Sequence, residues 1–160
     1  MSILATTIEA IIARVILMER AAVPDSIAAL DHALHEQTGV YWTNTINGGS
    51  STDQWVASNL LSMTLAIEMR LFVAPVTSDM PGNLEARVRE YAADTLYYFL
   101  ARRNLKRDDD DSVIAYLGAL GAGFTRYQFP TIFGSEKARK LGALFVLNVP
   151  IEMVIEQEML

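Results

Sequence analysis

Residues 61 to 73 alternate between apolar and mostly polar side chains, and this run constrains the fold more than any other stretch. Every odd position from Leu61 to Val73 is apolar, whereas the even positions include Glu68 and Arg70. Successive side chains of a strand point to opposite faces, so the run predicts one long strand with a single face in a core. A second alternating run, from Ala143 to Met153, predicts another such strand.

Helical periodicity and shorter alternating stretches account for most of the remaining chain. Apolar residues recur every three or four positions from Ile3 to Ala21, which predicts a first helix with Ser2 as its N-cap. The further predictions are a short helix from Asp25 to Gly39, a strand from Val40 to Ile46, a turn or mobile loop from Asn47 to Ser51, a helix capped by Asn83 and ending near Arg102 and Arg103, a short helix from Ser112 to Leu120, an edge strand from Phe124 to Ile132, a polar loop from Phe133 to Lys140, and a last strand from Leu141 to Ile155. Pro150 cannot donate a ladder hydrogen bond, so we expect it at an edge or a bulge.

This order of elements predicts an α+β fold, with helices packed on one face of a mostly antiparallel sheet. The long strand is expected in its centre, paired with the strand from Val40 and with the strands that end the chain. The 160 residues contain no internal repeat and no long linker, so residues 1–160 are expected to form one domain.

Composition restricts the possible functions. The formal charge is −6 and the pI is near 4.8, which opposes tight binding to a phosphate backbone but not a surface that DNA slides past. Cysteine is absent, so disulfides and thiolate metal sites are excluded. The apolar start carries Glu9 and Arg14 and is too short and charged to span a bilayer, so a soluble, intracellular protein without membrane contact is expected.

Three short motifs have residue types that also occur in metal or phosphate sites. His32 and His35 could share a metal, but no further ligands are signposted, and a solvated helix face is the simpler interpretation. Asp108 to Asp111 lack the ligand spacing of a calcium loop, and Gly118 to Gly123 lack the Lys of a phosphate loop. Glu68 and Glu152 are expected to face cations across the sheet, for example Arg70 or Arg126. The sequence therefore predicts no enzyme, no cofactor, and no catalytic or metal-binding residue.

Three stretches together resemble a known family: the amphipathic first helix, the Trp-led strand from Trp55 to Pro75 with a helix after it, and the closing run from Gly142 to Met153. This plan is similar to the tail terminators, which are neck proteins of long-tailed, lambda-type phages. The resemblance implies a structural virion protein whose small α+β subunits form a hexameric ring. Such a ring caps the tail tube and joins it to the head connector or stopper protein, after assembly in the host cytoplasm.

The resemblance and the irregular segments together suggest where contacts are made. Asp108, Asp109, Asp110 and Asp111 would line the lumen or rim of the ring, past which DNA moves without specific binding. Candidate subunit or partner contacts are Asn47, Gly48, Gly49, Tyr97, Phe133, Lys137, Arg139 and Lys140. Two alternatives remain at this point. One is another phage neck or tail-completion protein, and the other is a small-ligand-binding or regulatory α+β domain.

Overall fold

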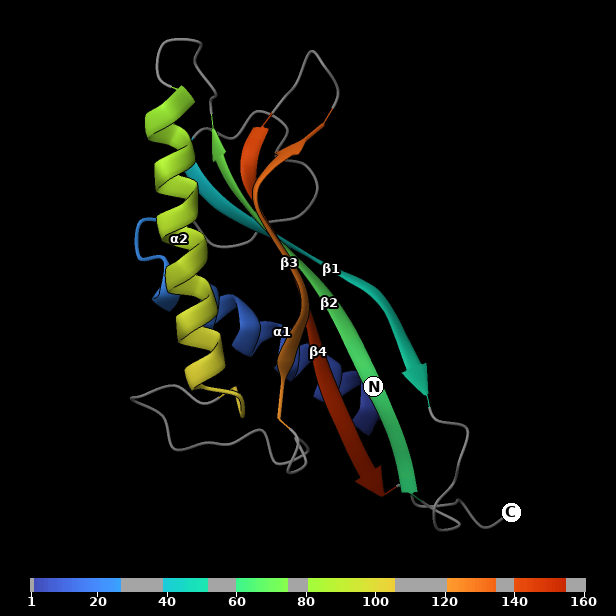
Figure 1. Cartoon of the computed structure of the whole chain (residues 1–160). Coiled ribbons are helices and arrows are strands. Elements are labelled where there is room, and N and C mark those ends of the chain that lie inside the picture. The colour runs from blue at the N-terminus through green and yellow to red at the C-terminus, as the bar shows by residue number, and fades with distance from the viewer. Residues whose placement is uncertain are drawn as a thin grey trace, which may run out of the picture.

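A computed structural model describes residues 2–26, 39–51, 60–74, 81–105, 121–134 and 140–154. Two helices and four strands follow one another in the order α1 (Ile3–Ala22), β1 (Gly39–Ser51), β2 (Leu60–Ala74), α2 (Pro81–Ala101), β3 (Gly123–Phe133) and β4 (Lys140–Val154). The strands form one antiparallel sheet in the order β1-β2-β4-β3, against which both helices pack (Figure 1). The predicted α+β architecture is therefore confirmed.

The strand predicted from the alternating run is β2, and it lies inside the sheet between β1 and β4. Leu65, Met69 and Leu71 are at most 3 % exposed, whereas Arg70 on the other face is exposed. Because side-chain direction alternates along a strand, a slip of one residue would turn this buried set toward solvent. The apolar pattern therefore fixes the register of β2 against both of its neighbours.

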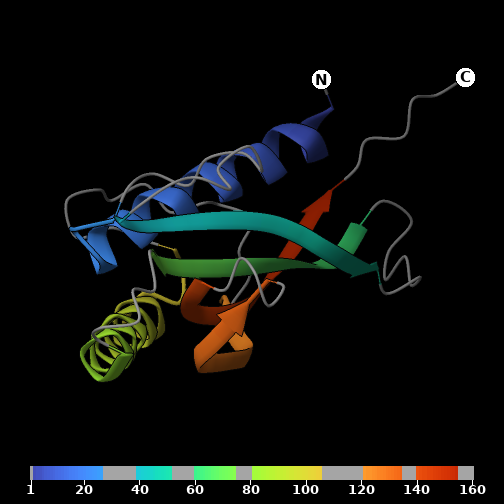
Figure 2. The ribbon, with the colours of Figure 1, turned by 90° about the horizontal axis from the view of Figure 1, so that it is seen from above.

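Each helix turns one apolar side toward the sheet. Helix α1 begins as predicted, with the Ala5 amide donating a 3.1 Å hydrogen bond to Ser2 Oγ, and it buries Ile11, Val15 and Met18. Helix α2 buries its own apolar stripe, which includes Val88, Ala92 and Phe99. The view from above shows α1 on the β1 side of the sheet and α2 on the β3–β4 side (Figure 2).

Two sequence predictions are corrected at the ends of elements. Asn83 does not cap α2, because the helix already begins at Pro81, whose fixed φ suits the first helical position. The segment from Asn47 to Ser51 is not a turn but the second part of β1. The register between β1 and β2 shifts between Ile46 and Gly49, where β1 has one residue more than β2. This extra residue forms a β-bulge, and the strand continues beyond it.

The two ends of the polar loop predicted from Phe133 to Lys140 belong to the paired strands β3 and β4. Phe133 and Lys140 lie opposite each other as the last residue of β3 and the first of β4, so they belong to strands, not to a loop. Pro150 pairs with Thr64 of β2 and lies past Asn148, where the pairing with β3 stops. At Pro150, β4 therefore has a described neighbouring strand, β2, on one side only. A proline, which has no backbone N–H to donate, is tolerated at such an edge position.

A chain of aromatic rings crosses the core from α2 to β1. The Phe99 ring lies 5.6 Å from that of Phe124, Phe124 lies 5.3 Å from Phe145, and Phe145 lies 6.0 Å from Trp42. Phe145 and Trp42 are fully buried.

Neither described helix combines the length and the apolar character needed to cross a bilayer.

Several predicted features lie outside the described residues. They are the helix from Asp25 beyond Ser26, the strand start at Trp55, the histidines His32 and His35, the acidic run from Asp108 to Asp111, the helix from Ser112 to Leu120, and the loop residues Lys137 and Arg139.

Candidate interaction surface

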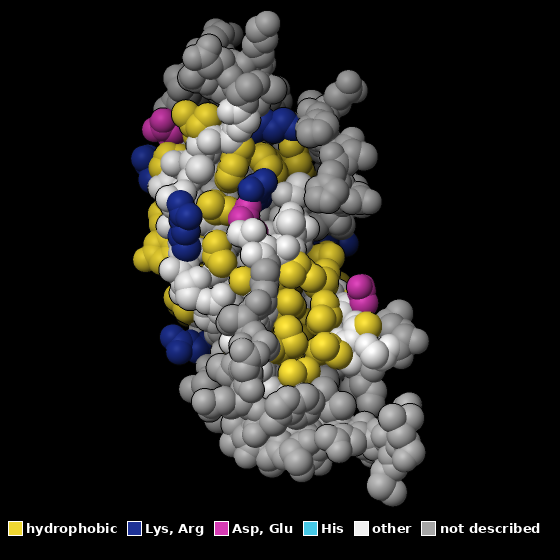
Figure 3. Space-filling model, turned by 90° about the vertical axis from the view of Figure 1, so that its right-hand side faces the viewer, with side chains coloured by type: hydrophobic (Ala, Val, Ile, Leu, Met, Phe, Trp, Pro, Cys, Tyr) yellow, Lys and Arg dark blue, Asp and Glu magenta, His cyan; other side chains and the backbone are white. Residues whose placement is uncertain are grey.

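The face of the sheet turned away from α1 and α2 carries the even-numbered side chains of β2 and their neighbours on the other strands. Neither described helix packs on this face. Half-buried apolar side chains on it include Leu144 and Val146 of β4 and Phe72 of β2. Figure 3 looks at the molecule from this side and shows hydrophobic side chains gathered beside charged ones. A solvated sheet face is normally polar, so this mixture is typical of a surface that contacts another molecule.

Three aromatic rings and two cations form a cluster at one end of this face. The Phe72 ring stacks 4.9 Å from Tyr41 and lies 4.9 Å from Phe133. Lys140 Nζ donates a 2.5 Å hydrogen bond to the Tyr41 hydroxyl, and the Arg70 guanidinium lies 5.8 Å from the centre of the Phe133 ring. Lys140 Nζ also lies 5.1 Å from the centre of the Tyr41 ring, so both cations lie over ring faces, where the electron-rich π system attracts them. We call these five residues the aromatic–cation cluster.

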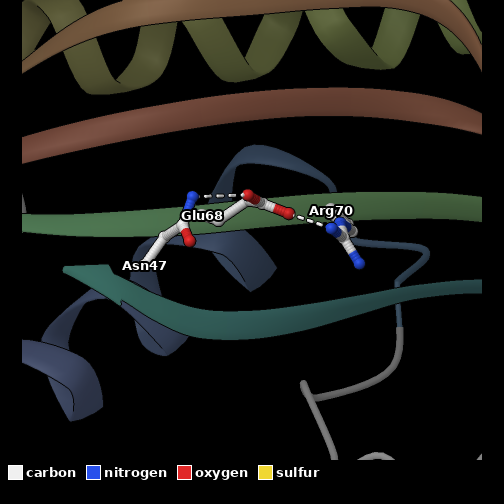
Figure 4. Close-up of polar contacts among 3 residues, drawn as sticks. All are labelled: Asn47, Glu68 and Arg70. Atoms are coloured by element: carbon white, nitrogen blue, oxygen red, sulfur yellow. Dashed lines mark hydrogen bonds and ion pairs between the residues drawn. The ribbon is translucent and has the colours of Figure 1, made fainter.

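A polar network continues the cluster toward the bulge in β1. Asn47 Nδ2 donates a 3.0 Å hydrogen bond to one carboxylate oxygen of Glu68, and the other carboxylate oxygen forms an ion pair with Arg70 (Figure 4). Arg70 is therefore a partner of Glu68 as predicted, but along the same strand instead of across the sheet. Because the Arg70 side chain is 45 % exposed, the pair adds little to stability and holds the guanidinium in position.

The structure brings together three of the predicted contact residues. Asn47, Phe133 and Lys140 come from separate segments but lie on one face, joined through Glu68, Arg70 and the aromatic rings. Gly48 and Gly49 belong to the β1 bulge beside Asn47. Tyr97 is separate from this group, because it lies on α2 and its side chain is 78 % exposed. Lys137, Arg139 and the four consecutive aspartates lie outside the described residues.

Sequence reasoning missed the central members of the cluster, which are Tyr41, Phe72 and Arg70. The signal that could have identified Phe72 and Arg70 was present, because the alternation in β2 already assigned both to the face away from the core. Tyr41 carried a weaker signal. Its position opposite Phe72 depends on the register between β1 and β2, which no single strand reveals.

Two further sets of apolar side chains are exposed on the described surface. On α2, Tyr97 is followed one turn later by Leu100, which is 44 % exposed. On the edge strand β3, Tyr127 is 54 % exposed and Ile132 is 60 % exposed, and both line a shallow open hollow along the strand. Aromatic and arginine side chains are enriched in protein interfaces, so the chemistry of this surface suits association with other protein chains.

No group of acidic, histidine or cysteine side chains in the described ranges is arranged to hold a metal ion. A comparison with known protein families finds none that matches this chain, and a search of curated proteins finds no significant relative.

Proposed function

We propose that this protein is a structural subunit of the neck of a long-tailed phage, in the position of a tail terminator. Copies of the chain form a ring that caps the tail tube and joins it to the head connector. The resemblance in sequence motivates this assignment, because the stretches that carry it include α1, β2 and β4, the elements that build the core. The acidic run from Asp108 to Asp111 is assigned to the lumen or rim.

The observation that carries the proposal is that unlike parts of the subunit surface offer apolar contacts. A ring closes when one patch of each subunit meets a different patch of the next. On the sheet face, the aromatic–cation cluster presents the half-buried Phe72 and Phe133 and the exposed Arg70, whereas its Tyr41 is buried. Tyr97 and Leu100 are exposed on α2, and Tyr127 and Ile132 are exposed on β3. These patches lie on different elements, as a head-to-tail contact requires, and only the aromatic–cation cluster carries cations.

Electron microscopy of the purified protein, together with its mass in solution, tests the proposal. Rings of one diameter and a matching multiple of the subunit mass are expected. A chain that stays monomeric at high concentration, both alone and with purified tail tubes, would contradict the assignment. Neighbouring genes for portal, tube or tape-measure proteins would add independent support.

Substitutions of exposed residues can locate the subunit contact. Tyr97→Ser and Ile132→Ser each remove an exposed apolar side chain, so each should leave thermal unfolding nearly unchanged and reduce ring formation. Leu17→Ser is the matched control, because Leu17 is also 42 % exposed but lies on α1. Equal losses of assembly in all three variants would show that general surface hydrophobicity, not a defined contact, drives association.

Replacing all four aspartates from Asp108 to Asp111 with Asn tests the lumen assignment. The far-UV circular dichroism spectrum and ring formation should both remain normal, because a lumen-lining charge contributes to neither. A normal spectrum with lost ring formation would move this run into the subunit contact.

A further inference from the structure

Glu19 is a carboxyl group enclosed in the contact between α1 and the sheet. Its side chain is 0 % exposed, and its Oε1 accepts a 2.6 Å hydrogen bond from Nδ2 of Asn44 on β1. Burial raises the pKa of Glu19 well above its ordinary value, and the hydrogen bond from Asn44 opposes this with a smaller effect.

Two oxygen atoms in the contact are buried without a hydrogen-bond partner in the structure. They are Glu19 Oε2 and Asn44 Oδ1, the remaining oxygens of the two groups that the 2.6 Å hydrogen bond already joins. A carboxylate oxygen and an amide oxygen are both acceptors, so an ionised Glu19 would leave both unsatisfied at a substantial free-energy cost. A protonated carboxyl instead supplies one O–H donor, and the Asn44 oxygen supplies the acceptor.

Among the described residues, no charged group on the surrounding elements forms a buried salt bridge with Glu19. On β1 and β2 the neighbours on this face are Trp42, whose buried Nε1 donates no hydrogen bond to Glu19 or to any other group, and Met69. Glu68 and Arg70 lie on the opposite face. The other charged groups on α1 are the half-buried Arg14 and the exposed Arg20. Arg87 of α2 donates a hydrogen bond to the Tyr91 hydroxyl, which in turn donates to Asp25, just after α1. Desolvation, not repulsion by a like charge, therefore disfavours the ionised form.

We propose that Glu19 is protonated in the folded protein and forms a two-way acid–amide pair with Asn44. The Glu19 O–H donates to Asn44 Oδ1, while the Asn44 N–H donates to Glu19 Oε1. The pair has no net charge, and its two hydrogen bonds link α1 to the edge strand β1. When the proton leaves, one of the two hydrogen bonds is lost and a charge remains in the core, so the helix–sheet contact weakens.

The direction of the pH dependence follows from proton binding. Between the unfolded pKa of a Glu, about 4.3, and the raised folded pKa, the folded state keeps a proton that the unfolded state has lost. The contribution of Glu19 to stability is therefore complete at pH values below the unfolded pKa and decreases as the pH rises to the folded pKa. This contact makes the protein more stable in mild acid than in mild alkali.

Urea unfolding of Glu19→Gln and wild type between pH 5 and pH 9 tests the proposal. A glutamine keeps both hydrogen bonds but has no proton to lose. Relative to the variant, the unfolding equilibrium constant of wild type should rise by up to about tenfold per pH unit within the window. Glu9→Gln is the matched control on the exposed side of α1 and should follow wild type. Parallel pH profiles for Glu19→Gln and wild type would overturn the proposal.

A direct measurement covers the case in which Glu19→Gln does not fold. Carbon-13 NMR of the wild-type protein reports the side-chain carboxyl of each glutamate as the pH changes. One glutamate, assigned to Glu19 through its contact with Asn44, should keep the chemical shift of a protonated carboxyl at pH 7. Titration of this signal in the ordinary range for glutamate would refute the acid–amide pair whatever the stability data show.

Discussion

Gly142 lies where β4 passes β2, and replacing it with alanine should strongly destabilise the fold. Gly142 pairs with Phe72 and is buried. A Cβ added to its backbone would overlap the Leu71 carbonyl oxygen and would lie 2.9 Å from both the Leu71 carbonyl carbon and Phe133 Cε2. The Phe133 ring can rotate away, but the carbonyl group is part of the central strand and can move only with the β2 backbone.

The cost of this overlap can be estimated from its surroundings. Overpacking a tight interior typically costs 1–3 kcal/mol, and a clash with backbone lies at the upper end, so we expect about 3 kcal/mol for Gly142→Ala. For a chain of this length, about 3 kcal/mol corresponds to a fall in Tm of roughly 6–12 °C. Adding Phe133→Leu should not restore the stability, because the Leu71 carbonyl remains in place.

Gly123→Ala is the matched control for this prediction. A Cβ at Gly123, the first residue of β3, would have no atom within 4 Å. Both substitutions reduce the entropy of the unfolded chain in the same way, so their difference isolates the clash. Urea unfolding followed by circular dichroism gives both free energies of unfolding. If the two variants differ by less than about 1 kcal/mol, the overlap at Gly142 does not constrain the sheet.

Two other predictions concern the core and the first helix. Phe145→Ala should lower the free energy of unfolding by about 3–5 kcal/mol, because Phe145 is fully buried between the Trp42 and Phe124 rings; an effect below about 1 kcal/mol in urea unfolding would contradict this packing. Ser2→Ala should cost about 1 kcal/mol in urea unfolding, because the amide of Ala5 loses its acceptor; Ser2→Asp, which keeps an acceptor, should retain the stability in the same assay.

The parts of the fold that follow from side-chain periodicity were predictable from the sequence. Strand β2 is the clearest case, because its alternation determines both the element and its buried face. The bulge in β1 was not predictable in the same way. Asn47, Gly48 and Gly49 have the composition of a turn, and only pairing with β2 keeps that segment extended.

The candidate surface was partly predictable for a related reason. Phe133 and Lys140 were expected as contact residues because they border an irregular segment, and the structure adds that they pair across β3 and β4. Glu19 had no sequence signal as a buried group, since a glutamate near the end of an amphipathic helix normally faces water. Its burial depends on the position of α1 over β1, which is a tertiary property.

The position of β2 between β1 and β4 has a consequence for how the chain folds during synthesis. Strand β1 leaves the ribosome just before β2, so these two strands can pair early as neighbours in sequence. The other edge of β2 cannot form its hydrogen bonds until β4 has been synthesised, since Leu60 pairs with Val154 and Val73 pairs with Leu141. All of α2 and β3 must be translated in the interval. Such long-range pairing is slow, so β2 keeps one unpaired edge until β4 has been translated, and an unpaired strand edge is prone to aggregation.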